Sequence, residues 1–302
     1  MLCALLFCLL WIANAWGAEP LYVVTTSTDL KALVQVVGGE RVQAESLAPP
    51  LHDPHALEIK PGQLSKIKEA SLLVRIGLDH EPWLDRALRT LSDRRFVRDS
   101  PNYLDTSKGI QLLQAETPRV RPDKGAHVHG FGNTHYWLDP ENSKPITAAI
   151  LEALARLAPG ERRYFAANRK RFLDQLDERL KIWLRAMARL KGTRVVTVHE
   201  TWPYFAQRFG LVVVAVVEPT PGIPPSPSYL ASLIQKMRDS GIKLLIAEPY
   251  SNASVVRQLT SQSGATAIRL IPSVGGDSEA ADYLSLFDLN IKRLSSAAAA
   301  AR

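Results

Sequence analysis

Three of the seven histidines stand where side chains of a folded α/β protein could share one metal ion. His55 closes the run Leu51-His-Asp-Pro-His55, directly after a predicted strand, and His199 ends another predicted strand. His135 precedes a predicted helix. Ligands of open α/β sheets bind beyond the carboxyl ends of the strands, so His55 and His199 could face one crevice from opposite lobes. Three converging imidazoles are typical of a site for Zn²⁺ or a similar cation, each donating one nitrogen at about 2.0–2.1 Å.

The remaining histidines have weaker positions. His80 begins a predicted helix, and we expect it on the surface. His127 and His129 lie on a glycine-rich stretch near His135, where they form either a mobile collecting loop or a merely solvent-exposed segment. The sequence assigns no role to His52.

The first 18 residues are typical of a secretory signal peptide. Met1–Ala18 is apolar, holds no charged side chain and ends in small residues, as signal peptidase requires, although the usual basic start is missing. Both cysteines, Cys3 and Cys8, lie in this segment. The mature chain therefore has no thiol, which excludes disulfides, thiolate metal sites and cysteine nucleophiles, and a metal site must use His, Asp and Glu. We expect a periplasmic protein without a lipid anchor, because bulky residues precede Cys8.

The composition is that of a globular protein. The chain has 302 residues, of which 46% are hydrophobic, and its mean hydropathy is close to zero. One large or two medium domains can form proper cores at this length, and the composition argues against disorder or a multi-span membrane protein. The net charge of +7 is spread along the chain, which predicts a mildly basic surface and no nucleic-acid partner.

Short β-rich runs alternate with amphipathic helices on both sides of a long helical region. This order predicts βαβ units and mainly parallel sheets, and hence an α/β fold. The predicted strands are 21–26, 42–47, 72–76, 194–199, 211–217, 243–247 and 266–270. The predicted helices are 29–37, 61–69, 82–91, 202–209, 229–239, 253–263 and a last one from Glu279.

The helical region between the two sets predicts how they are joined. Its apolar residues recur at steps of three or four, which is one face of a helix; they are Phe172, Leu176, Leu180, Trp183, Met187 and Leu190. A single long helix should permit only modest relative motion. We therefore expect a signal peptide (1–18), an N-terminal α/β lobe (19–158), a linking helix (159–191) and a C-terminal α/β lobe (192–302), with the metal cleft between the lobes.

Four segments together resemble the zinc- and manganese-binding solute-binding proteins of ABC importers. They are Asp53-Pro-His55 with Glu58 and Pro61, Gly132-Asn-Thr-His-Tyr-Trp-Leu-Asp-Pro140, His199 with Trp202-Pro-Tyr-Phe205, and Glu218-Pro-Thr-Pro-Gly-Ile-Pro-Pro-Ser-Pro227. The resemblance covers about residues 20 to 295. It implies two (β/α) lobes with parallel sheets joined by one rigid helix, a periplasmic location, and metal ligands at His55, His135 and His199. It also implies a divalent ion as cargo and a membrane permease as partner.

The chain departs from the family at the fourth ligand. The family usually has an aspartate in the last lobe, where this chain reads Leu270-Ile-Pro-Ser-Val-Gly275, and neither Pro272 nor Ser273 supplies a carboxylate. Glu248, at the end of a predicted strand, is our candidate for this position, and Asp277 or a water molecule are the alternatives. Glu248 could equally orient an imidazole from outside the ligand set.

Binding without catalysis is the function that these features favour. Three nitrogens and few oxygens favour Zn²⁺ over Mn²⁺, and ligand type alone leaves copper and nickel open. The alternative is a zinc-dependent hydrolase in which Glu200 or Glu248 activates a metal-bound water, although the chain has no His-Glu-x-x-His motif. A metal-binding adhesin or storage module would share the same site. We expect the protein to be a monomer.

Overall fold

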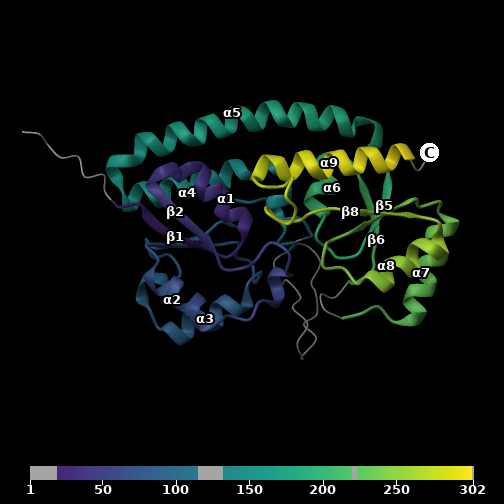
Figure 1. Ribbon diagram of the computed structural model, residues 1–302, viewed down its shortest axis with the longest axis horizontal. Helices are drawn as coiled ribbons and strands as arrows, with labels where there is room; N and C mark the ends of the chain where they lie inside the picture. Colours follow the sequence, from purple (N-terminus) through teal and green to yellow (C-terminus); the bar gives the residue numbers. More distant parts are fainter. Residues whose placement is uncertain (1–18, 115–131, 220–222, 301–302) are drawn as a thin grey trace, which may run out of the picture.

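The computed structural model describes residues 19–114, 132–219 and 223–300, and these residues form two α/β lobes side by side (Figure 1). Each lobe has a four-stranded parallel sheet, with strand orders β2-β1-β3-β4 and β6-β5-β7-β8. The predicted fold class is therefore confirmed. Within the described ranges, no helix is long and apolar enough to cross a membrane.

The N-terminal lobe is built from βαβ units. Its elements are β1 (Leu21–Thr25), α1 (Thr28–Gly38), β2 (Val42–Ser46), α2 (Pro61–Glu69), β3 (Leu72–Arg75), α3 (Pro82–Leu91), β4 (Tyr103–Asp105) and α4 (Ser143–Leu157). β3 is buried along its whole length, as expected for a strand covered by helices on both faces. Ser27 caps α1 by accepting a hydrogen bond from the Leu30 amide, which fixes the turn directly after β1.

The C-terminal lobe repeats this construction. Its elements are β5 (Arg194–Thr197), α6 (Pro203–Phe209), β6 (Val212–Val216), α7 (Pro227–Asp239), β7 (Leu244–Ala247), α8 (Ala253–Ser263), β8 (Thr266–Arg269) and α9 (Tyr283–Ala300). In both sheets the first strand of the lobe lies inside the sheet, and the strands that follow it are added first on one side of it and then on the other. Such a switch point is where parallel sheets bind ligands.

The long helix α5 (Arg162–Met187) runs over both lobes, and α9 lies beside it (Figure 1). The predicted apolar stripe is its buried face, with Phe172, Leu176, Trp183 and Met187 all buried. α9 also contacts α1, so the connection between the lobes is broader than a single helix.

Two elements differ from the prediction. β4 (Tyr103–Asp105) was not predicted, because a strand of three residues that pairs only with β3 gives almost no sequence pattern. The last helix begins at Tyr283 and not at Glu279. The Asp282 carboxylate accepts hydrogen bonds from the amides of Leu284 and Ser285, so the helix is capped four residues later than its composition suggests.

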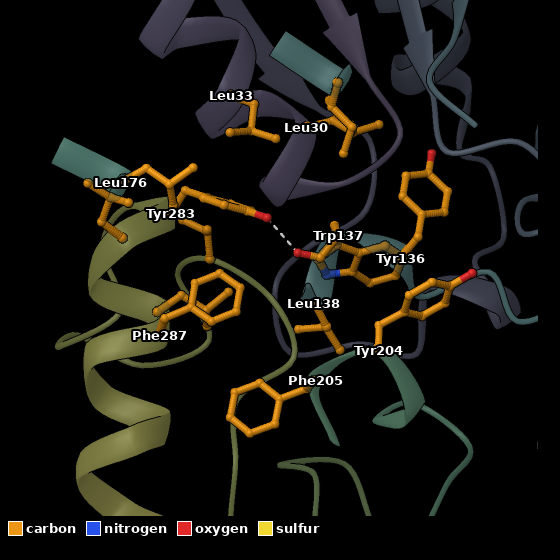
Figure 2. Packing of buried hydrophobic residues seen from close by; sticks show 14 of the residues in the cluster. Leu30, Leu33, Tyr136, Trp137, Leu138, Leu176, Tyr204, Phe205, Tyr283 and Phe287 are labelled. Atoms are coloured by element: carbon orange, nitrogen blue, oxygen red, sulfur yellow. Dashed lines mark hydrogen bonds between the residues drawn. The ribbon is translucent and has the colours of Figure 1, made fainter. Parts of the chain in front are cut away.

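Aromatic side chains fill the space between the lobes (Figure 2). Trp137 lies at the centre and is 2% exposed; its carbonyl accepts a hydrogen bond from the Tyr283 hydroxyl, and its indole nitrogen donates to the Pro272 carbonyl. Tyr204 and Phe205, from α6, pack nearby. The segment that carries His135 is therefore anchored in a core shared by both lobes.

Candidate metal centre

Three histidines of the N-terminal half converge in the interior. One ring nitrogen from each of His55, His80 and His135 lies within 4.8 Å of the corresponding nitrogens of the other two. The Nε2 atoms of His55 and His135 are 3.3 Å apart. His55 and His135 are 9% and 7% exposed, and His80 is fully buried. The expectation that His80 lies on the surface is wrong, because its ring packs between the other two imidazoles and Trp137.

Neighbouring oxygens hold the Nδ1 atom of each ring. Nδ1 of His55 is 3.1 Å from the His80 carbonyl, Nδ1 of His80 is 2.8 Å from the Thr134 hydroxyl, and Nδ1 of His135 is 3.2 Å from the Asn133 side-chain oxygen. With Nδ1 engaged in this way, Nε2 is the nitrogen through which each ring would bind an ion. Metal-binding histidines in proteins are oriented by such contacts.

Short local structures present His55 and His135. Asp53 caps the single helical turn Pro54–Ala56 by accepting a hydrogen bond from the His55 amide, and the Trp83 indole donates to the Pro54 carbonyl. The Asn133 side chain accepts a hydrogen bond from the His135 amide at 3.0 Å and donates to the Glu200 carbonyl at 2.8 Å. The Asn133 amide therefore ties the His135 segment to the C-terminal lobe.

Glu81 holds the turn that presents His80. This buried carboxylate accepts hydrogen bonds from the Thr26 hydroxyl at 2.6 Å and from the amides of Ile76 and Gly77 at 2.7 and 3.1 Å. It also pairs with the buried Arg75 guanidinium at 3.2 Å. These donors come from the carboxyl ends of β1 and β3 and from the turn itself, so the carboxylate locks the turn onto the sheet.

His199 lies in the other lobe between two carboxylates. Its Nδ1 is 2.7 Å from Glu248 Oε2, and its Nε2 is 3.0 Å from Glu218 Oε2. Burial acts to lower the pKa of His199, but the hydrogen bond to Glu248 and the charges of Glu248, Glu218 and Asp53 outweigh it and raise the pKa to about 9. Within the described residues, His199 is not part of the cluster formed by His55, His80 and His135.

Glu248 is engaged on both oxygens. Oε1 accepts a hydrogen bond from the Trp202 indole at 2.7 Å, and Oε2 contacts both His199 and the Ser251 hydroxyl. Its side chain is fully buried. These contacts match a carboxylate that orients His199, the alternative role that the sequence left open for it.

The segment 270–275 is joined to the N-terminal lobe. The Val274 amide donates to the buried Asp29 carboxylate at 3.0 Å. Burial, opposed by this hydrogen bond and one from Ser273, raises the pKa of Asp29 to about 7. The alternative ligand Asp277 instead accepts a hydrogen bond from Arg293 at 2.6 Å.

The sequence reasoning thus missed His80 in the cluster and Glu218 beside His199. Both lie just beyond the carboxyl ends of strands, β3 and β6, so the criterion that selected His55 and His199 could have found them. His127 and His129 lie outside the described residues.

Comparisons with known proteins agree with this architecture. A putative metal-binding protein of Treponema pallidum (strain Nichols) is 26% identical over 282 residues, covering 91% of this chain and 86% of that protein. The high-affinity zinc uptake system protein ZnuA of Paracoccus denitrificans (strain Pd 1222) is 29% identical over 246 residues, 74% of each chain. The solved structure of the SBP FpvC from Pseudomonas aeruginosa in complex with Mn²⁺ shares the fold, with a TM-score of 0.79 at 23% identity over 94% of this chain and all of that one.

The family model described as zinc-uptake complex component A, periplasmic, matches residues 23–297, nearly the whole described chain. The chain belongs to this family of periplasmic zinc-uptake components.

Proposed function

We propose that this protein is exported through the signal peptide 1–18, binds one divalent transition-metal ion as a monomer, and delivers it to the membrane permease of an ABC importer. Zn²⁺ is the foremost cargo, and Mn²⁺ ranks below it. Family membership supports the role in metal import, and the name of the Paracoccus relative supports zinc. The protein would act by binding and release and not by catalysis.

The geometry of His55 and His135 is the observation that carries this proposal. Two nitrogens bound tetrahedrally at 2.0–2.1 Å from one zinc ion lie about 3.3–3.4 Å apart. The Nε2 atoms of the two rings are 3.3 Å apart, and both Nδ1 atoms have protein partners. The two rings are thus already oriented to share a cation.

We assign His199 as the ligand from the C-terminal lobe, binding through Nε2 after it leaves Glu218. Glu248 would keep its contact with Nδ1 and so orient the ring. We therefore assign Glu248 the role of orienting His199, in place of the tentative role as a metal ligand. Its engagement by the Trp202 indole and the Ser251 hydroxyl supports this choice.

The ligand types support zinc as cargo. Imidazole suits zinc, copper, iron and nickel, whereas Mn²⁺ prefers carboxylate and water. Within the described residues, the candidate metal cluster consists of histidines alone.

The test is metal uptake by the purified protein. Native mass spectrometry with elemental analysis should find about one zinc per chain, and zinc should raise the melting temperature by mass action. Titration calorimetry that shows no saturable zinc uptake at neutral pH would overturn the proposal.

A further inference from the structure

We propose that His80 is a metal ligand, so that the cargo ion is held by four imidazoles and no carboxylate. This inference rests on the proposed function and deepens it, since His80 takes the place of the acidic residue that the segment 270–275 lacks. The observation behind this inference is that the His80 ring lies beside those of His55 and His135, with one nitrogen of each ring within 4.8 Å of the other two.

The three rings form one compact group. The His80 ring centroid is 4.2 Å from that of His55 and 5.4 Å from that of His135. The ring nitrogens lie up to 4.8 Å apart, whereas two nitrogens bound to one tetrahedral zinc ion are about 3.3 Å apart. Binding would therefore draw the rings together around the ion.

The backbone before His80 is strained in a way that supports a functional role. Gly77, Leu78 and Asp79 all have left-handed φ angles, of 83°, 57° and 58°. Glycine adopts this conformation without penalty and aspartate tolerates it, but Leu78 must be held in it by its surroundings. Non-glycine residues in such conformations concentrate at ligand-binding sites.

The same turn serves two imidazoles. Glu81 fixes it through the amides of Ile76 and Gly77, and a side chain at Gly77 would collide with Asp105 at 2.2 Å. The turn presents the His80 ring to the cluster, and the backbone carbonyl of His80 lies 3.1 Å from Nδ1 of His55. One braced turn therefore positions one imidazole directly and a second through a hydrogen bond. If His80 served only to pack against Trp137, the turn would need neither to direct the His80 ring to the cluster nor to contact Nδ1 of His55.

A four-imidazole set has a consequence for selectivity. Neutral nitrogen donors leave the ion with its full double charge, and Glu248 and Glu218 beside His199 are carboxylates that supply compensating negative charge. Such a site favours Zn²⁺, Co²⁺, Ni²⁺ and Cu²⁺ and strongly disfavours Mn²⁺, which prefers oxygen ligands. His80 would thus act as a specificity-determining ligand.

The first test substitutes His80→Gln and uses His52→Gln as the matched control, because His52 is an exposed histidine in the turn region before His55. Zinc affinity should fall on the order of 100-fold or more in His80→Gln, beyond the roughly 10–100-fold that losing an outer partner of a ligand costs. His52→Gln should bind like the parent protein. Parent-like affinity in His80→Gln would overturn the inference.

His80 is fully buried, so the substitution could also disturb folding. The second test therefore uses the unmodified protein loaded with zinc alone, and X-ray absorption spectroscopy counts its ligands. The inference requires four imidazole nitrogens; three imidazoles with an oxygen would overturn it while leaving the proposed function intact. Failure of the parent protein to bind zinc at all would instead overturn the proposed function.

Discussion

The two sides of the candidate site hold their histidines differently. In the N-terminal half, the partners of His55, His80 and His135 at Nδ1 are a carbonyl, a hydroxyl and an amide oxygen, which carry no charge. In the C-terminal lobe, His199 is bound on both nitrogens by carboxylates, Glu248 and Glu218.

We infer from this difference that the two sides contribute to metal capture at different stages. The oxygens at Nδ1 orient the three rings of the N-terminal cluster. Two carboxylates favour the protonated form of His199, which cannot bind a metal, so this ring must release a proton and leave Glu218. We therefore expect the N-terminal cluster to provide the initial site and His199 to complete it.

Removing one ring from each side should have the largest and most unequal effects. His55→Ala should lower zinc affinity on the order of 100-fold or more. His199→Ala should lower it less, because the three nitrogens that remain are those of the cluster, which already lie within 4.8 Å of one another. Competition titrations with a chelator of known affinity would measure both. A larger loss in His199→Ala than in His55→Ala would reverse the proposed order of capture.

Glu248→Gln should have an intermediate effect. Glutamine keeps an oxygen for the Trp202 indole but removes the charge that orients Nδ1 of His199, and outer-shell changes of this kind cost about 10–100-fold in metal affinity. Calorimetric titration of both variants would compare the zinc affinity of Glu248→Gln with that of His199→Ala. If Glu248→Gln binds zinc like the parent protein, Glu248 neither ligates the ion nor orients its ligand.

Proton release should distinguish the two sides further. The pKa of His199 is raised to about 9, so its ion pairs stabilise the metal-free fold fully below about pH 6.5, and that stability is lost as pH rises through 9. Zinc must displace this proton at neutral pH. Titrations in buffers of different ionisation enthalpy should count about one more proton released by the parent than by His199→Gln. Equal proton counts would mean that His199 stays outside the ligand set.

How far the sequence predicted this molecule depends on which interactions are local. The helices α2, α3 and α8 have the predicted bounds, because prolines or a capping asparagine mark where they begin. Both parallel sheets followed from the alternation of strands and helices. The strand-end rule selected His55 and His199. β5 ends at Thr197 and not at His199, so His199 lies just beyond the strand, whereas His55 lies in a helical turn after the loop that follows β2.

The remaining features depend on packing between distant segments. From the sequence, His80 was expected on the surface before a helix. It is buried because Trp137 and His135, more than fifty positions later in the chain, pack against its ring. Similarly, Glu248 contacts Trp202 and His199, which lie in the loop after the neighbouring strand and far away in the sequence. The position of His80 after a strand can be read from the sequence, but these contacts between distant segments cannot.

Glu218→Gln should produce the smallest change, and in the opposite direction. Glu218 contacts Nε2 of His199, the nitrogen that we assign to the metal, so the two compete for the same position. Replacing the carboxylate with an amide weakens this competition and lowers the pKa of His199, since one of the charges that raise it is lost. Zinc affinity at pH 7 should therefore rise, within about a tenfold range because one pKa unit corresponds to a factor of ten. The gain should shrink as pH approaches 9, where the ring loses its proton in the parent protein as well. The matched control is Glu279→Gln, an exposed carboxylate paired with Lys292 that should leave zinc affinity unchanged at every pH. A clear loss of affinity in Glu218→Gln would show that this carboxylate assists the bound ion and does not compete with it, and the distinction between the two sides of the site would then need to be redrawn.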